Sequence, residues 1–151
     1  MASITLLSPV YYVHHQQLFY GHRSINDHFS DGSPLEKLAY DVINDDVDVL
    51  NFEPMLIKKV NGKRFVIDGN RRLFVYKQLH ECGCDVGFVP VQFTTRPEHR
   101  VLVRPDEGVQ IGVRGRGNAA VEREIWRLAR VDKPTPSDKL SAFFHQLAVR
   151  R

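Results

Sequence analysis

A glycine turn between a strand-like segment and a helix-like segment constrains the fold of this chain more than any other feature. Residues 64–67 are rich in β-branched and aromatic side chains, a pattern typical of a β-strand. The segment 68–70, Asp-Gly-Asn, ends that pattern, and residues 71–82 then run without proline or glycine. Because Gly83 supplies the expected stop signal, the sequence predicts a strand, a tight turn and a helix in direct succession.

The residues before this turn predict a hairpin. Asn61-Gly62 separates the strand-like segments 55–60 and 63–68, and this dipeptide is the strongest short signal for a two-residue hairpin turn. Further strands are expected at residues 10–13 and 87–95, and a second hairpin is expected from residues 101–104 and 109–113.

Three segments carry helix signals. Residues 33–43 begin with Ser-Pro-Leu-Glu, which predicts a capping box, and continue with apolar residues at helical spacing. Asn118 is predicted to cap a second helix, and residues 135–138 predict the start of a last one. We therefore predict an α+β fold, in which a small mixed sheet with packed helices spans residues 1–117 and a C-terminal helix pair spans residues 118–151.

The composition is that of a globular protein. Apolar residues make up 42% of the chain and charged residues 26%, which excludes the disordered class. No apolar run approaches the ~20 residues that cross a bilayer, and residues 1–13 lack the positive start and cleavage site of a signal peptide. Cys82 and Cys84 lie two positions apart, a spacing that suits neither a disulfide nor a zinc site. We therefore expect an intracellular protein with reduced thiols and no membrane partner.

The start of the helix after the glycine turn is a candidate anion site. The first N–H groups of a helix have no partner within the helix, and the helix dipole makes this end positive. Arg71 and Arg72 add two cations there, an unfavourable arrangement that a bound anion would relieve. Two other interpretations stay open. Arg72 could pair with an acid such as Asp68 or Glu36, and Asp68 could cap the helix or, less simply, bind Mg²⁺.

The motif Asp68-Gly69-Asn70-Arg71-Arg72-Leu73 and the order of the segments before it resemble the ParB/sulfiredoxin superfamily, including its uncharacterised ParB-like members. Members share a strand, a Gly-x-x-Arg turn and a helix, and the similarity covers residues 10–91. The resemblance implies a nucleotide such as ATP, ADP or CTP, bound with Mg²⁺, or another phosphorylated small molecule. It places the ligand at Asp68, Gly69, Asn70, Arg71 and Arg72. It also implies phosphoryl transfer or hydrolysis, in which the arginines would stabilise developing charge.

Departures from the superfamily pattern narrow these expectations. Sulfiredoxins carry their nucleophilic cysteine where this chain has Asn70. An amide cannot act as that nucleophile, so sulfiredoxin activity is not expected. The related ParB-like serine kinases need an acidic base from the N-terminal segment. The candidate carboxylates for that catalytic role in this chain are Asp27, Asp31 and Glu36.

Two other classes of function stay open. A ParB-like DNA-binding or nuclease-type module would place Arg71, Arg72, Arg114 and Arg116 on nucleic-acid phosphates. The tail from residue 94 onward does not, however, resemble the helix-turn-helix domain of partition ParB. A degenerate domain would instead serve protein interaction through the helix pair that starts at Asn118. A homo-oligomer is compatible with each of these classes.

Four histidines near the N-terminus raise the question of a metal site. His14, His15, His22 and His28 fit no zinc-binding spacing, and their segment has no clear helical pattern. We therefore expect hydrogen-bonded or solvent-exposed imidazoles and no metal ion, with one histidine as a candidate general base beside the anion site.

Overall fold

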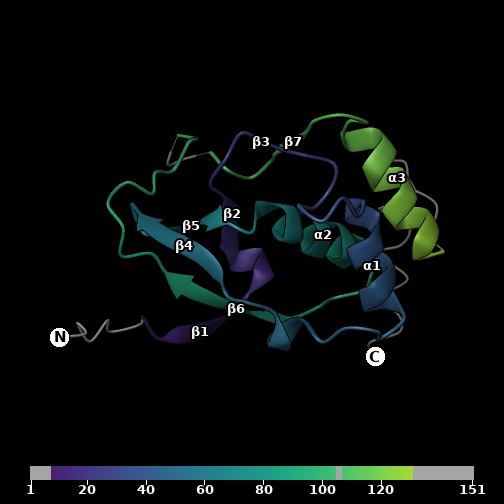
Figure 1. Cartoon of the computed structure of the whole chain (residues 1–151), viewed down its shortest axis with the longest axis horizontal. Coiled ribbons are helices and arrows are strands. Elements are labelled where there is room, and N and C mark those ends of the chain that lie inside the picture. Colours follow the sequence, from purple (N-terminus) through teal and green to yellow (C-terminus); the bar gives the residue numbers. More distant parts are fainter. Residues whose placement is uncertain (1–7, 105–106, 131–151) are drawn as a thin grey trace, which may run out of the picture.

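The computed structural model describes residues 8–104 and 107–130 and shows a mixed α and β architecture (Figure 1). The strands are β1 (Val10–His14), β2 (Leu18–Tyr20), β3 (Ser24–Ile25), β4 (Met55–Val60), β5 (Lys63–Asp68), β6 (Phe88–Phe93) and β7 (Gly112–Val113). The helices are α1 (Leu35–Ile43), α2 (Asn70–Glu81) and α3 (Asn118–Leu128), with short 3-10 helices η1 (His15–Gln17) and η2 (Val49–Asn51). This arrangement confirms the predicted α+β class.

A mixed five-stranded sheet, in the order β1-β6-β4-β5-β2, forms the base of the fold. β4 and β5 form the predicted antiparallel hairpin, with Val60 opposite Lys63 across the Asn61-Gly62 turn. β2 pairs with β5 in parallel, and β6 pairs with β4 in parallel. β3 and β7 form a separate parallel pair. β5 therefore has a neighbour along each edge, and the glycine turn at its end starts from a fixed position.

Helix α2 is buried on several sides because it lies between the sheet and the other two helices (Figure 1). Leu73, Phe74, Val75 and Tyr76 occupy consecutive positions and are all buried. α1 contacts both α2 and α3, and α3 contacts α2. A helix that is packed in this way has no single apolar face. The packing holds the start of α2 firmly at the end of β5.

The helix predicted over residues 33–43 forms as α1, but the predicted capping box was wrong. α1 begins at Leu35, and Pro34 stands at the N-cap position without a side-chain cap. The hydroxyl and the N–H of Ser33 both donate to Oδ1 of Asp31, over 2.6 and 2.9 Å. This local turn around Asp31 engages the serine that was predicted to cap the helix.

The second predicted hairpin was also wrong. Residues 101–104 form no strand, and β7 pairs with the distant β3 instead. Asn118 is the first residue of α3 rather than its cap. Its side chain accepts a hydrogen bond from the N–H of Val113 and donates one to the carbonyl of Ile111. These bonds tie the start of α3 to β7 and engage main-chain groups that a hairpin partner would have used.

Helix α3 shares the hydrophobic core of the rest of the fold, since Val121 and Ile125 belong to the same buried cluster as Leu35 and Leu73. The last predicted helix, which would start at residues 135–138, lies outside the described residues. Within residues 8–104 and 107–130, none of the helices combines the length and the apolar character that crossing a bilayer requires.

Candidate functional site

The turn between β5 and α2 requires glycine for two reasons. Gly69 has a φ angle of 116°, a left-handed conformation that other residues rarely adopt. A Cβ atom at this position would also lie 2.5 Å from Cγ of Met55 on β4. The backbone therefore makes a sharp, tightly packed turn that leads directly into the first residues of α2.

Helix α2 begins without a side-chain cap. Its first intrahelical hydrogen bond runs from the N–H of Leu73 to the carbonyl of Gly69, over 2.9 Å. In the part of the chain that the structure describes, no acceptor meets the N–H groups of Asn70, Arg71 and Arg72. Asp68, one of the expected caps, accepts none of them. Three donors thus remain free at the positive end of the helix dipole, an arrangement that favours an anion.

The side chain of Asn70 serves the fold. It is only 4% exposed, its Oδ1 accepts from the N–H of Gly21, and its Nδ2 donates to the carbonyl of Val66, over 3.2 and 2.9 Å. These bonds join the start of α2 to the segment after β2 and to β5. The amide side chain of Asn70 is therefore engaged within the fold, which leaves its backbone N–H as the group that could contact a ligand at this predicted position.

Arg71 and Arg72 bind neutral groups of the protein. Arg71 donates to the carbonyl of His28 and to Oγ of Ser30, over 3.0 and 3.2 Å. Arg72 donates to the carbonyl of Glu53 over 2.6 Å. The alternative in which Arg72 pairs with Asp68 or Glu36 is not the arrangement in the structure, because the guanidinium of Arg72 points toward the loop before β4. Among the described residues, neither arginine forms an ion pair with a carboxylate.

A pocket of about 390 Å³ lies in front of the turn, and we call it the anion pocket. Gly69, Asn70, Arg71 and Arg72 line it, as do His22, Asp68, Phe29 and Arg114. Arg114 is exposed, and its backbone N–H binds the carbonyl of Ile25 over 2.8 Å, which fixes this residue beside β3. No described residue forms an ion pair with Arg114. The pocket therefore combines free N–H donors with unpaired guanidinium groups.

Two titratable side chains on the wall of the anion pocket could take part in chemistry. Burial lowers the pKa of His22, although the charge of Asp68 opposes that effect, so the imidazole is neutral near pH 7 and can accept a proton. Asp68 is exposed and is the one carboxylate among the described residues that line this pocket. The neutral imidazole of His22 could act as a general base. The carboxylate of Asp68 could bind a Mg²⁺ ion.

The carboxylates of Asp27 and Glu36 are bound to Arg116. Asp27 accepts the backbone N–H and the Nε–H of Arg116, each over 3.0 Å, and Glu36 accepts two N–H bonds over 2.7 and 3.0 Å. The hydrogen bond from the Arg116 main chain, together with those from His28 and the Arg116 side chain, lowers the pKa of Asp27. Burial would raise the pKa of Glu36, but the hydrogen bond and charge of Arg116 outweigh it, and this pKa is lowered too.

This network corrects two of the sequence-based expectations. Asp27 and Glu36 are stabilised as anions by Arg116, so they are poor candidates for a general base. Asp31 is engaged by Ser33, whose side-chain hydrogen bond lowers the pKa of the Asp31 carboxyl. Arg116 itself is neutralised by two carboxylates and is not available to nucleic-acid phosphates, unlike Arg114.

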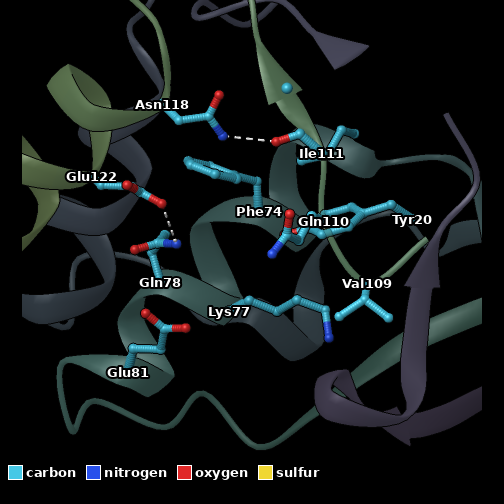
Figure 2. A pocket seen from close by; sticks show the side chains of 11 residues that line it. Tyr20, Phe74, Lys77, Gln78, Glu81, Val109, Gln110, Ile111, Asn118 and Glu122 are labelled. Carbon is cyan, nitrogen blue, oxygen red and sulfur yellow. Dashed lines mark hydrogen bonds between the residues drawn. The ribbon is translucent and has the colours of Figure 1, made fainter. Parts of the chain in front are cut away.

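A larger pocket, of about 580 Å³, lies between α2, β7 and the start of α3 (Figure 2). Its polar side chains mainly satisfy one another: Gln78 donates to Glu122, and Asn118 donates to the carbonyl of Ile111. Burial lowers the pKa of Lys77, which shares the wall of this pocket with Glu81. Because the pocket holds charges of both signs and mostly paired donors, it is a weaker candidate than the anion pocket.

Comparisons with protein-family models, with curated proteins and with solved structures give no match to this chain. The resemblance to the ParB/sulfiredoxin superfamily therefore stays a prediction from the sequence.

Proposed function

We propose that this chain binds a phosphate group, carried by a nucleotide with Mg²⁺ or by another phosphorylated small molecule, in the anion pocket. One observation carries the proposal: the residues at the start of α2 whose N–H groups have no acceptor among the described residues line a pocket that is also lined by arginines without a carboxylate partner. Buried or half-buried cations without counter-ions are costly, and an anion bound there offsets that cost. The resemblance to the ParB/sulfiredoxin superfamily supports the same ligand class.

The number and kind of donors favour phosphate over a carboxylate ligand. A terminal phosphate has three oxygens, which the N–H groups of residues 70–72 and the guanidinium of Arg114 could share. Asp68 would repel such an anion if it contacted it directly, but a Mg²⁺ ion between them turns the same carboxylate into a favourable ligand. The ring of Phe29 on the pocket wall lies beneath the guanidinium of Arg71, 5.9 Å from the ring centroid, and helps to hold this cation at the pocket.

Turnover would need a base in addition to charge stabilisation. His22 is the described pocket residue best suited to accept a proton from an attacking hydroxyl or water, because it lies on the pocket wall and its imidazole is unprotonated near pH 7. Arg71 and Arg114 would stabilise charge that develops on the transferred phosphoryl group. These residues would support phosphoryl transfer or hydrolysis. His22 would be the general base, the role for which the sequence suggested Asp27, Asp31 and Glu36.

DNA binding through the same arginines is a less supported alternative. Arg116 is neutralised by Asp27 and Glu36, which removes one of the four cations that this alternative needs. Arg71, Arg72 and Arg114 remain, but they line a concave pocket rather than a flat basic surface. A single terminal phosphate fits this geometry better than a continuous duplex backbone does.

Isothermal titration calorimetry of the full chain with Mg²⁺ and ATP, ADP or CTP tests the proposal, with adenosine as a ligand that lacks phosphate. We expect binding of at least one nucleotide and none of adenosine. Arg114→Ala removes an exposed side chain that no described residue pairs with, and we expect affinity to fall by about 10- to 100-fold, the value of one charge-assisted hydrogen bond. Arg123→Ala, on the exposed side of α3, is the matched control and should bind as the unmodified chain does.

Short duplex DNA, titrated at low and high salt, separates the alternatives. Nucleotide binding that Arg114→Ala weakens and Arg123→Ala leaves unchanged supports the proposal. Absence of nucleotide binding together with salt-sensitive DNA binding overturns it in favour of the DNA-binding class. Nucleotide binding that is equal in both variants places the ligand elsewhere and also overturns it.

A further inference from the structure

Three histidines and one aspartate converge at the end of α2 that lies opposite the glycine turn. His14 ends β1, His15 begins η1, His80 lies in the last turn of α2, and Asp85 follows that helix. Each of these side chains offers one ligand atom, and the four atoms lie within 4.8 Å of one another. The Asp85 carboxylate is central, 3.2 Å from Nε2 of His14, 3.7 Å from Nδ1 of His15 and 3.5 Å from Nδ1 of His80.

Two imidazole nitrogens in this cluster are buried without a hydrogen-bond partner. They are Nε2 of His15 and Nδ1 of His80. The His15 side chain is completely buried, so water does not satisfy it. A polar atom that is buried without a partner is costly and rare in native proteins, and a bound ion is one of its ordinary explanations. Nδ1 of His80, which lies 3.5 Å from Oδ1 of Asp85, is the unpartnered nitrogen that faces the carboxylate, and it points to a ligand independently of the clustering itself.

The main chain of Gly87 orients two members of the cluster. Its carbonyl accepts a hydrogen bond from Nδ1 of His15 over 3.0 Å, and its N–H donates to Oδ1 of Asp85 over 2.8 Å. With the proton on Nδ1, Nε2 of His15 carries the free lone pair that a metal ion requires. Hydrogen bonds of this kind hold metal-binding histidines and carboxylates in place at known metal centres. Gly87 has a φ angle of 73°, which favours glycine at this position.

We propose that His15, His80 and Asp85, with His14 as the fourth ligand, bind a divalent transition-metal ion of the Zn²⁺ class. Imidazole nitrogens with one carboxylate oxygen suit Zn²⁺ or Co²⁺, whereas Mg²⁺ and Ca²⁺ prefer sites made of oxygen. The C-terminal end of α2 adds the negative end of the helix dipole, which favours a cation.

Coordination of the metal ion by His14 would break one exposed hydrogen bond, the one between His14 and the N–H of Gln16. Its Nδ1 accepts the N–H of Gln16 over 3.2 Å, so its proton lies on Nε2, next to Asp85. Coordination through Nε2 requires that proton to move to Nδ1. The N–H of Gln16 then loses its acceptor and is hydrogen-bonded by water instead. Because this contact is exposed, solvent replaces it readily. His15, His80 and Asp85 therefore carry most of the affinity.

The proposed metal site is separate from the anion pocket and has a structural role. The 12 residues of α2 span about 18 Å at 1.5 Å per residue, so the two sites lie at opposite ends of the helix. The ligands come from the β1–η1 segment, from α2 and from the loop before β6. One ion would thus join three segments that are far apart in the sequence.

Metal titration of the full, untagged chain tests this inference. The protein is stripped with a chelator, then titrated with Zn²⁺ in competition with a chromophoric chelator, and separately with Co²⁺, whose visible absorption reports four-coordinate geometry. We expect one ion per chain, an intense Co²⁺ spectrum that Zn²⁺ abolishes, and no competition by Mg²⁺. We also expect Zn²⁺ to raise the midpoint of thermal unfolding.

Two variants and one control locate the ion. His80→Ala and Asp85→Asn change partly exposed side chains and should weaken Zn²⁺ binding by at least about 10-fold, the lower value seen for loss of even an outer-shell partner. His99→Ala, which lies outside the cluster beside Thr94, should leave the affinity unchanged. If His80→Ala does not fold, Asp85→Asn alone decides the question. Affinity that neither variant lowers, or the absence of a one-to-one complex, overturns the proposal.

Discussion

The side chain of Asn70 provides a quantitative test of how the glycine turn is held. Asn70→Ala removes both hydrogen bonds of the amide and leaves the N–H of Gly21 and the carbonyl of Val66 buried without partners. Each unsatisfied group costs about 1–3 kcal/mol, so the two together cost about 2–6 kcal/mol. The bond from Gly21 is long, at 3.2 Å, which places the expected loss in the lower half, about 2–4 kcal/mol.

Urea and thermal unfolding followed by circular dichroism measure this loss. For a chain of this size each kcal/mol lowers the midpoint by about 2–4 °C, so a fall of roughly 5–15 °C is expected. Asn26→Ala removes an exposed amide from the same pocket and is the matched control, with a change within about 0.5 kcal/mol.

Ligand binding by the folded Asn70→Ala variant completes the test. Because only the backbone N–H of Asn70 is free to contact the ligand, affinity should change little once the protein is folded. A variant as stable as the control that has lost ligand binding would refute this reasoning, since the amide would then serve the ligand rather than the fold.

Three further outcomes follow from the structure. Gly69→Ala forces a Cβ to within 2.5 Å of Met55 at a positive φ angle, and should cost about 2–5 kcal/mol in urea unfolding. Asp27 has a lowered pKa, so its contribution to stability is full above its ordinary value of 3.8 and is lost as pH falls below that value. In acid titrations of Arg116→Ala this contribution should be smaller but not absent, because the variant keeps the backbone N–H of residue 116 and the hydrogen bond from His28. Burial raises the pKa of Cys82 to about 12, so iodoacetamide at pH 8 should modify this thiol far more slowly in the folded chain than in urea.

The sequence predicted correctly those elements of the fold that depend on a few neighbouring residues. The hairpin follows from Asn61-Gly62, and the turn into α2 follows from Gly69, because positive φ angles at these residues decide the backbone path. The predicted hairpin over residues 101–113 failed for the opposite reason. β7 pairs with β3, nearly ninety positions earlier, and nothing in the local pattern of residues 101–113 encodes that partner.

The anion pocket was predictable only in part, because several of its contacts join residues that are far apart in the sequence. Arg71 and Arg72 lie beside the turn in sequence, whereas Arg116 reaches Asp27 and Glu36 across 89 and 80 positions. Sequence spacing could not separate Arg114, which stays free, from Arg116, which is paired. The histidine cluster was missed because His80 and Asp85 join His14 and His15 only after α2 has packed against the sheet. The expectation of no metal rested on the spacing of the N-terminal histidines alone.

The most direct test of the anion pocket is the response of its own backbone N–H groups to a phosphate ligand. Amide resonances of the isotopically labelled chain are followed by NMR while ATP with Mg²⁺, and separately inorganic pyrophosphate, are added. The account predicts the largest shifts at Asn70, Arg71 and Arg72, with further shifts near Arg114, and the same shifts at about 10- to 100-fold higher ligand concentration in Arg114→Ala. Shifts centred instead on the pocket beside Lys77, or no shifts at residues 70–72 at saturating ligand, would contradict it.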